Sequence, residues 1–435
     1  MKTDLVIIGA GITGLCCSYF SKQDHLVFEK NNQPGGVCRT EKKAGFYFDY
    51  AEHFIRIPNE AVKNLLINVL KEKLFSQELN SKILIDNNLI PYPFQKSIYY
   101  LSNKNKKVCL EGFINRKKYS ELDEKNFGNW FLKNYGDGIS KLFMYPYNQK
   151  IWCIDPHKIR ADFSFDPNLI PEISLDNMLD YTFFSIEERA GIDKYIRYYI
   201  HGEGISELPK ALAKNNKDII YNKEVFRISP VEKRVYFLDG TCCEYNKLVS
   251  TIPINLLVNF VDNSPDEIKE VAADLKYNSV YILNFALNRK IDFGYHWLYI
   301  PEPNYQFSRI YSLNNFSKDL VPRNKSSLSV LTTYLPGKKS EINREKIISQ
   351  ILGLNYFNED DIEFVYEQDI SYGFTIPTLD SVDIVKKIKD YLSPYNIYTI
   401  GRYGEWRYLG IEHAISEAEQ VCKFLEKLDT TRIFS

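Results

Sequence analysis

The sequence lacks the cysteine and histidine patterns that mark metal sites and secreted disulfide frameworks. None of its eight cysteines forms a Cys-x-x-Cys pair, and four of them stand as adjacent pairs, at 16–17 and 242–243, which cannot easily bridge. The six histidines form no cluster along the chain. We therefore expect no metal site, and we expect reduced thiols in a cytoplasmic protein.

The sequence also has no apolar run of about 18 residues, the length that a membrane-spanning helix needs. The short apolar segment at residues 5–8 is followed by glycines and by no small-residue cleavage site, so we expect no signal peptide. The net charge of −1 gives no electrostatic reason to expect nucleic acid or an anionic membrane as partner. With 44% hydrophobic residues among 435, the composition is that of a globular protein of roughly two or three domains.

A glycine-rich turn lies between an apolar strand and a helix near the start of the chain. Residues 5–8 form a buried apolar run, and Gly9, Gly11 and Gly14 then match the spacing G-x-G-x-x-G. Gly9 suits the tight turn, Gly11 the close approach of a pyrophosphate, and Gly14 the packing of helix on strand. A second strand ends in Glu29, whose carboxylate can accept hydrogen bonds from ribose hydroxyls. These features together predict a dinucleotide site.

The segment after Glu29 indicates which dinucleotide binds. Residues 31–40, "NNQPGGVCRT", resemble the G-G-x-x-R/S-T segment of the FAD enzymes related to amine oxidases, protoporphyrinogen oxidases and UDP-galactopyranose mutases. Gly35 and Gly36 allow a second close approach of the backbone to the cofactor, and Arg39 can pair with phosphate. We therefore predict FAD rather than NAD.

Pieces of dinucleotide-binding type recur in the middle and at the end of the chain. Residues 83–100 read as a hairpin, 104–190 as helices with breaks at Pro146, Pro156 and Pro167, and 276–375 as strands. The predicted fold class is α/β: a discontinuous Rossmann-like FAD-binding domain with an inserted helical domain and a twisted antiparallel sheet. The predicted domains are 1–80, 200–260 and 385–435 for FAD, 104–190 for the helices, and 81–103 and 261–384 for the substrate sheet.

Six stretches follow the order found in UDP-galactopyranose mutases. They are "PYPFQ" (91–95), "PYNQKIW" (146–152), "GEGISELPKALA" (202–213), "HWLYIPEPNYQFSRIYSLNNFS" (296–317), "GFTIPTLD" (373–380) and "GRYGEWRY" (401–408). Over most of its length the chain resembles this family, nearer to its eukaryotic-type branch. The resemblance implies that the substrate lies across the flavin, between the FAD domain and the sheet.

The resemblance assigns substrate roles to seven residues. Tyr92 and Gln95 match contacts to the uridine end, and Asn148 and Trp152 match the uracil site, where an amide can read the base edge and an indole can stack. The alternative for Trp152 is a place in the core. The residues matching a clamp on the substrate diphosphate are Tyr299, Arg309 and Tyr408. Arginine suits this task because its planar fork makes two charge-assisted bonds to phosphate.

The resemblance also assigns residues to the flavin. Gly401 and Arg402 would lie where the last strand of the FAD domain meets the last helix, whose N-terminus can face the pyrimidine end of the flavin. His53 matches a histidine that responds to the redox state of the flavin; its alternative is a core histidine. Val225, in the middle piece, is a further candidate for cofactor contact. We predict catalytic roles for His53 and Arg309.

The chain departs from the family pattern at three places. Glu52 stands where the family has a small residue beside the flavin, and a carboxylate there would be pushed aside or would disfavour a reduced, anionic flavin. Phe374 replaces an expected tyrosine and so lacks a hydroxyl for phosphate. A family arginine aligns near residues 166–167, which are Asp and Pro, and Arg160 is the nearest arginine in sequence.

The implied activity is that of an isomerase of polysaccharide biosynthesis that interconverts the pyranose and furanose rings of a UDP-sugar. In this family the N5 atom of reduced flavin forms an adduct with the sugar, and NADPH or NADH would supply the electrons. The alternatives are an FAD-dependent oxidoreductase of the amine oxidase or protoporphyrinogen oxidase type, and a flavin-binding relative without catalysis. The identity of the sugar and of the nucleotide, and assembly into a homo-oligomer, stay open.

Overall fold

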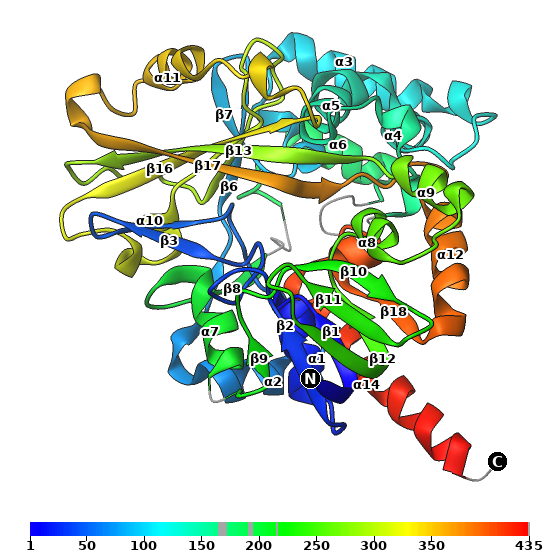
Figure 1. Cartoon of the computed structure of the whole chain (residues 1–435). Coiled ribbons are helices and arrows are strands. Elements are labelled where there is room, and N and C mark those ends of the chain that lie inside the picture. Colours follow the sequence, from blue (N-terminus) through cyan, green and yellow to red (C-terminus); the bar gives the residue numbers. More distant parts are fainter. Residues whose placement is uncertain (164–171, 190–194, 215, 434–435) are drawn as a thin grey trace.

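The computed structural model describes residues 1–163, 172–189, 195–214 and 216–433, and in these the chain is built around two seven-stranded sheets (Figure 1). The first sheet carries the N-terminal strand, and the second sheet, with its long strands β13, β16 and β17, lies above it in the view. Two further two-stranded sheets, β3–β4 and β5–β8, complete the strands of the described residues. No helix in the described ranges has the length and apolarity to cross a bilayer.

The first sheet has the order β10-β11-β12-β1-β2-β9, with β18 also paired to β12. Its strands are β1 (Lys2–Ile8), β2 (His25–Phe28), β9 (Ile219–Ile220), β10 (Val225–Ser229), β11 (Arg234–Phe237), β12 (Cys242–Ser250) and β18 (Ile397–Thr399). The strands β9, β2, β1, β12 and β18 pair in parallel, and β10–β11–β12 pair in antiparallel fashion. The start, the middle and the end of the chain therefore share one sheet.

Both faces of the first sheet are covered, as its apolar strands require. In β1, Leu5 and Ile7 belong to the core on one face, and Val6 and Ile8 belong to the core on the other. Helices α1 (Ile12–Phe20), α2 (Glu60–Leu70), α7 (Glu207–Ala213) and α14 (Ile411–Ile433) contribute to the first core, and α8 (Ile254–Phe260), α9 (Asp266–Ala273) and α12 (Ser381–Leu392) to the second.

The second sheet has the order β17-β13-β16-β15-β14-β6-β7. Its strands are β6 (Ser81–Ile85), β7 (Asn88–Pro91), β13 (Tyr277–Leu287), β14 (Trp297–Tyr299), β15 (Arg309–Tyr311), β16 (Ser326–Tyr334) and β17 (Ile362–Thr375). All neighbours are antiparallel except β14 and β6. The sheet predicted as antiparallel thus contains one parallel pair, because β6 arrives from a remote segment and not through a hairpin.

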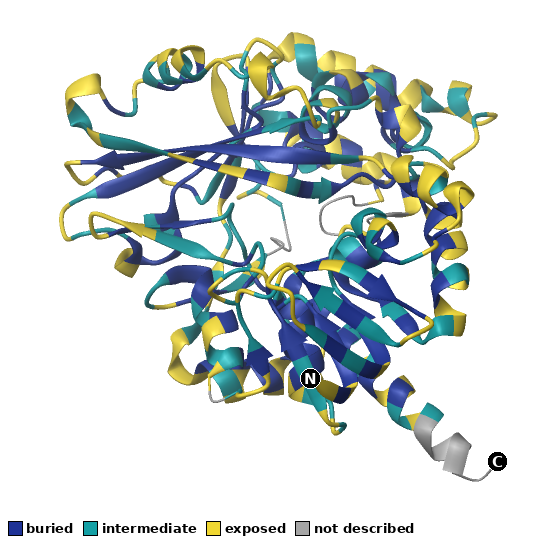
Figure 2. Cartoon of the chain, viewed as in Figure 1, coloured by how far each residue is buried: buried dark blue, intermediate teal, exposed yellow. Residues whose placement is uncertain are grey.

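The second sheet is also buried on both faces along its centre, where β13 and β16 are dark in Figure 2. Val280 and Ile282 join a core that includes the helical segment, whereas Tyr281 and Leu283 join a separate core with α11 (Arg344–Leu352). Because side chains alternate between the two faces of a strand, this one sheet packs against both cores. The short helix α10 (Leu313–Phe316) lies between β15 and β16 in the sequence.

The helical segment contains α3 (Asn103–Ile114), α4 (Phe127–Ile139), α5 (Tyr145–Trp152) and α6 (Leu175–Phe183). Pro146 does not break it: a π-helical turn at 140–144 leads directly into α5, and Pro146 lies in the first turn of that helix, where proline is tolerated. Pro156 does follow the end of α5, in a short 3₁₀ turn. Pro167 lies outside the described residues.

Local turn chemistry produces the β6–β7 hairpin. Asp86 and Asn87 connect the strands, and both have positive φ, +50° and +59°. Aspartate and asparagine tolerate this region better than other non-glycine residues do, so the predicted turn forms where its residues favour it.

Two short strand pairs are separate from the large sheets. β3 (Thr40–Lys43) pairs with β4 (Phe46–Asp49), and β5 (Leu74–Glu78) pairs with β8 (Ile196–Ile200). After β4, the segment 50–54 reaches the second sheet, where the Phe54 ring meets Trp297 of β14 at 5.2 Å and stacks on Phe316 of α10 at 4.5 Å between centroids. This segment carries Glu52 and His53 toward both sheets. The boundaries of the three predicted domains stay a prediction.

Candidate active site

A cavity of about 1110 Å³ is bordered by both large sheets and by the helical segment. Of the residues predicted to hold the cofactor, those that line it are Gly9, Gly11, Glu29, Gly35, Gly36, Val225 and Arg402. Of those predicted for substrate or catalysis, it is lined by His53, Tyr92, Gln95, Asn148, Trp152, Tyr299, Arg309 and Tyr408. Residues from distant parts of the sequence therefore face one shared space.

The turn between β1 and α1 has a backbone that requires glycine. Gly9 has φ +98°, and a Cβ there would lie 2.5 Å from Thr251 Oγ1. Gly11 caps α1, and a Cβ on it would meet nothing nearer than Gly36 Cα at 4.0 Å. The N–H of Gly35 donates to the carbonyl of Ala10 at 2.8 Å, which ties the second glycine segment to the first. Both segments thus approach the cavity with bare backbone.

Glu29 lies at the end of β2 and is buried in the cavity wall. One carboxylate oxygen accepts the N–H of Ala10 at 2.9 Å, and the other accepts the N–H of Asn31 at 2.9 Å. The oxygen that binds Asn31 also accepts its side-chain Nδ2 at 2.5 Å, whereas the oxygen that binds Ala10 keeps a second lone pair for a hydroxyl hydrogen. Its orientation is set before any ligand binds.

Three predicted cofactor residues lie outside the cavity lining. Gly14 packs α1 against the turn, and a Cβ there would lie 1.9 Å from the Gly9 carbonyl oxygen. Gly401 has φ +82°, and its Cβ would lie 2.6 Å from Thr13 Oγ1. The guanidinium of Arg39 lies 4.7 Å above the ring of Tyr50. The two glycines therefore shape the backbone that surrounds the cavity.

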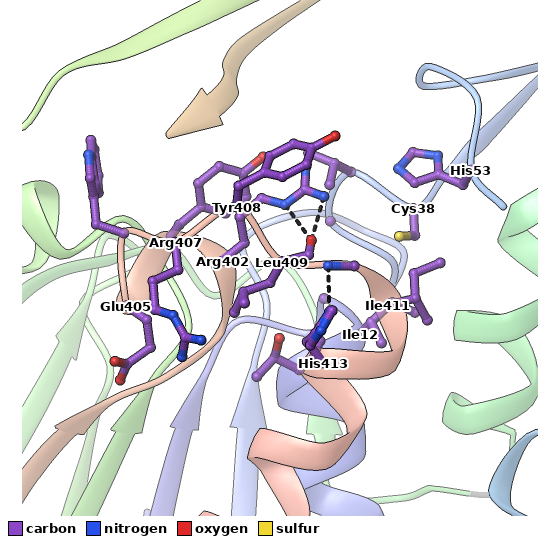
Figure 3. A pocket seen from close by; sticks show the side chains of 18 of the residues that line it. Ile12, Cys38, His53, Arg402, Glu405, Arg407, Tyr408, Leu409, Ile411 and His413 are labelled. Atoms are coloured by element: carbon purple, nitrogen blue, oxygen red, sulfur yellow. Dashed lines mark hydrogen bonds between the residues drawn. The ribbon is translucent and has the colours of Figure 1, made fainter. Parts of the chain in front are cut away.

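The corner between β18 and α14 contributes Arg402 and Tyr408 (Figure 3). Arg402 follows β18 in the short helix α13 (Gly401–Gly404), and its Nε and Nη2 donate to the carbonyl of Leu409 at 2.9 and 2.6 Å. The same guanidinium lies 5.2 Å from the ring centre of Tyr408. The arginine thus fixes the chain just before α14 begins.

Arg309, on β15, is buried in the opposite wall. Its Nη1 donates to Glu52, and its Nη2 donates to the hydroxyl of Tyr147 at 2.9 Å. Its guanidinium also lies 5.1 Å from the ring centre of Tyr299 and 5.7 Å from that of Trp297. Burial by itself would lower the pKa of Arg309, but Glu52 and the tyrosines reverse this and hold it above its usual range. Arg309 is therefore a permanent cation in the cavity.

Aromatic rings surround that cation. Tyr92 and Tyr299 stack with centroids 4.6 Å apart, and Tyr147 meets Tyr299 edge-on at 5.3 Å. Burial raises the pKa of Tyr92 and of Tyr299 above the usual value, so both hydroxyls stay protonated at neutral pH and can donate hydrogen bonds. Tyr92 and Tyr299 thus lie near Arg309 and Tyr147 joins them, whereas Tyr408 lies at the corner with Arg402.

Trp152 ends α5 and connects the helical segment to the corner of β18 and α14. Its ring meets those of Tyr408 and Phe374 at 5.6 and 6.1 Å, and its Nε1 donates to Asn148 Oδ1 at 3.3 Å. Asn148 Nδ2 in turn donates to the Met144 carbonyl at 2.8 Å. The Asn148 amide is therefore held by its own helix, with one hydrogen and one lone pair left for a ligand.

Gln95 lies deeper in the wall, where its Nε2 donates to the hydroxyl of Tyr135 at 3.3 Å. It belongs to the short turn 94–96 that follows β7. Because this turn packs in the large core that also contains α4, Gln95 is placed by the core and reaches the cavity from its side.

A family model described as "Flavin containing amine oxidoreductase" matches residues 20–354 of the chain. The chain belongs to this family. The match covers most of the chain; it begins after the glycine turn and includes the buried acid at the end of β2. The family resemblance predicted from the sequence is confirmed, and the family supports a flavin cofactor.

Curated proteins match parts of the chain. UDP-galactopyranose mutase from Mycoplasma pneumoniae is 23% identical over 206 residues, which is 44% of this chain and 50% of that protein. Coproporphyrinogen III oxidase from Staphylococcus aureus is 31% identical over 105 residues, 21% of this chain and 22% of that protein. The chain thus aligns with half or less of the length of these relatives.

Solved structures match over nearly the whole chain. A crystal structure of reduced UDP-galactopyranose mutase has a TM-score of 0.91 at 22% identity, with 98% of this chain and 94% of that chain covered. A putative protoporphyrinogen oxidase from Exiguobacterium has a TM-score of 0.74 at 16% identity, with 98% of each covered. These likenesses confirm the predicted α/β fold class.

The residues present fit a flavin dinucleotide. The glycine turn leaves the first N–H groups of α1 open toward the cavity, where pyrophosphate can bind. Glu29 is pre-oriented to accept ribose hydroxyls, and Val225 offers an apolar wall at the start of β10. We expect the dinucleotide to follow this strip toward His53 and Arg402.

His53 lies in the same cavity as a neutral imidazole. Burial, with a further contribution from Arg402, lowers the pKa of His53 to about 4. Its Nδ1 lies 3.2 Å from the carbonyl of Ala51, which can only accept, so the proton is on Nδ1 and Nε2 is a free acceptor. At neutral pH the ring stays uncharged and can accept one hydrogen bond.

Asp49 anchors the segment that carries Glu52 and His53. Its carboxylate is fully buried and accepts hydrogen bonds from Thr40 Oγ1 at 2.6 Å, Tyr199 OH at 2.5 Å and the Ile205 N–H at 3.2 Å. Burial raises its pKa from 3.8 to about 6, although the hydrogen bonds oppose this. β4 is therefore joined to the segment 204–206 through a carboxylate that is costly to ionise.

We expect Asp49→Asn to remove a pH dependence of stability. Because the pKa of Asp49 is higher in the folded than in the unfolded chain, its stabilising effect is present below about pH 4 and is lost as the pH rises through about 6. The difference corresponds to about 3 kcal/mol. Urea unfolding of both proteins at pH 4, 5 and 7 measures this difference. The free energy of unfolding of the variant should rise relative to that of the wild type as the pH rises. A difference that stays constant with pH would contradict the raised pKa of Asp49.

Some site contacts are absent from the sequence-based prediction. Tyr147 is adjacent to Asn148 in "PYNQKIW" and accepts a hydrogen bond from Arg309, a signal that the motif already contained. Arg56 pairs with the buried Glu412 at 2.8 Å, and both line the cavity. Arg160 lines it too but is paired with Asp162. The aligned place of the family arginine, 166–167, lies outside the described residues.

Proposed function

We propose that the chain is an FAD-dependent mutase that interconverts the pyranose and furanose rings of a UDP-sugar, with the reduced flavin as the active form. The observation that carries this proposal is the shared cavity: the glycine turn of a dinucleotide site and a buried arginine among tyrosines face one space of about 1110 Å³. An arginine with phenolic neighbours suits a diphosphate and has no task on an amine substrate.

When bound, a reduced flavin would supply the nucleophile for the anomeric carbon, in a reaction without net redox change. Arg309 binds the nucleoside diphosphate and stabilises the negative charge that gathers on it as the glycosidic bond breaks. Tyr299 and Tyr408 donate hydrogen bonds to the phosphate oxygens. The same contacts retain the leaving group for its return to the sugar.

The nucleoside end lies toward the helical segment in this proposal. Trp152 stacks on the base, the remaining hydrogen and lone pair of Asn148 read its edge, and Tyr92 and Gln95 close the wall. His53 stays neutral because its pKa is lowered to about 4, so its Nε2 can accept a hydrogen bond from the ligand or the cofactor. NADPH or NADH is the proposed reductant.

Turnover with reduced flavin tests the proposal. The purified protein is reduced with dithionite and incubated with a panel of UDP-hexopyranoses, and the products are separated by chromatography. We expect conversion to the furanose isomer of at least one sugar, many turnovers per flavin and no loss of reductant in step with product. Product that forms only once per flavin would contradict the proposal.

An FAD-dependent oxidoreductase of the amine oxidase or protoporphyrinogen oxidase type is the second candidate. Two observations favour it: the relation to coproporphyrinogen III oxidase, and Glu52, which neutralises the charge of Arg309. Such an enzyme would reoxidise its flavin with an acceptor in every cycle. Oxygen uptake on addition of a porphyrinogen or an amine, with no UDP-sugar turnover, would support this candidate.

A further inference from the structure

Glu52 presents an unpaired oxygen inside the cavity. Its side chain is 1% exposed, and one carboxylate oxygen binds Arg309 Nη1. The other oxygen, Oε2, is buried and has no hydrogen-bond partner in the part of the chain that the structure describes. A buried carboxylate oxygen without a donor is costly, so this position favours a ligand that supplies one.

Arg309, the partner of Glu52, has an unpaired hydrogen-bond donor. Nη1 and Nη2 are engaged by Glu52 and Tyr147, whereas Nε is buried and has no acceptor among the described residues. The pair therefore offers a ligand one hydrogen-bond donor and one acceptor. Its net charge is zero, since the carboxylate cancels the guanidinium.

The unpaired acceptor of Glu52 and the unpaired donor of Arg309 together determine which chemical group of a ligand fits. A phosphate oxygen satisfies Arg309 Nε, but it has no hydrogen for Glu52 and is repelled by the carboxylate. An ammonium group satisfies Glu52 but is repelled by the guanidinium. A hydroxyl group both donates and accepts, and a sugar next to a phosphate brings hydroxyls and phosphate oxygens together.

Building on the proposed function, we propose that Glu52 is a specificity-determining residue: it accepts a hydrogen bond from a sugar hydroxyl and weakens the binding of a free nucleoside diphosphate. The site then binds a nucleotide sugar in preference to the bare nucleotide. Only the ligand with a sugar supplies a hydroxyl that donates to Glu52, and this hydrogen bond offsets the repulsion between the carboxylate and the neighbouring phosphate. Glu52 performs this task without contact to the base, which lies at the Trp152 end.

Calorimetric titration of the flavin-loaded, oxidised protein tests this inference, since the oxidised form binds ligand without turnover. UDP and UDP-galactose are titrated into the wild type and Glu52→Gln. The amide keeps the size of the side chain and removes its charge, so we expect UDP to bind at least tenfold tighter and UDP-galactose to gain much less. The ratio of the two dissociation constants, UDP over UDP-galactose, should therefore fall severalfold.

Two further variants separate charge from position. Glu52→Asp retains the charge but withdraws the carboxylate, so UDP should bind as weakly as to the wild type while UDP-galactose loses affinity. Glu405→Gln is the matched control, because Glu405 lines the same cavity and is paired with Lys389 at 2.7 Å. This control should shift both ligands equally and leave the ratio unchanged.

The outcomes distinguish this inference from the proposed function. Tight UDP binding with the same ratio in the wild type and Glu52→Gln would overturn the role of Glu52 and leave the mutase proposal intact. Absence of binding of both ligands to the wild type, Glu52→Gln and Glu52→Asp, each with full flavin content, would overturn the proposed function and this inference with it.

Discussion

Arg309→Lys is expected to lower kcat/KM for the UDP-sugar by roughly 10² to 10³, or about 3–4 kcal/mol. Arg309 reaches Glu52 and Tyr147 with separate nitrogens and keeps Nε for a ligand. Lysine has one nitrogen on a flexible stem, so it cannot serve all three partners at once. A partner left unpaired in this buried wall adds to the loss.

The loss should appear in ligand binding as well as in turnover. Because the pKa of Arg309 lies above its usual range, the wild type is charged at every working pH and the effect should not depend on pH between 6 and 8. Calorimetry with UDP and steady-state rates with reduced flavin measure both, after the flavin content has been matched. A kcat/KM within threefold of wild type would contradict the proposed clamp.

Arg289→Lys is the matched control for this experiment. Arg289 follows β13 in the same half of the molecule, and its half-exposed guanidinium binds Asp361. Exposed pairs contribute little, so this change should leave both binding and turnover near wild type.

Gly11→Val is expected to give a folded protein that does not retain flavin. The protein itself has room for the side chain, since a Cβ on Gly11 would meet only Gly36 Cα at 4.0 Å. The added atoms would occupy the space that the pyrophosphate needs at the start of α1. We expect flavin affinity to fall by a factor on the order of 10² or more.

Gly14→Val separates loss of cofactor from loss of fold. A Cβ on Gly14 would lie 1.9 Å from the Gly9 carbonyl oxygen, which the backbone cannot relieve without moving the turn. This variant should lose about 3 kcal/mol of stability or more in its flavin-free form. Gly11→Val should match the flavin-free wild type in urea unfolding. A Gly11→Val protein with wild-type flavin content would contradict the dinucleotide site.

The parts of the fold that depend on neighbouring residues could be predicted from the sequence. The β6–β7 hairpin forms because Asp86 and Asn87 accept positive φ, and the β1–α1 turn forms because its glycines stand at fixed spacing. The place of Pro146 could not be predicted in this way. A π-helical turn before it removes the break that proline usually causes, and that turn depends on packing.

The sequence by itself determined the flavin family, the Rossmann-like start and the types of residue that the cavity would need, because these follow from patterns a few residues long. Only the tertiary structure decided which charges meet. Glu52 and Arg309 are 257 positions apart, and Asp49 and Tyr199 are 150 apart, so no local pattern pairs them. Burial then sets their energies, since a buried charge must find a partner and only the folded chain supplies it.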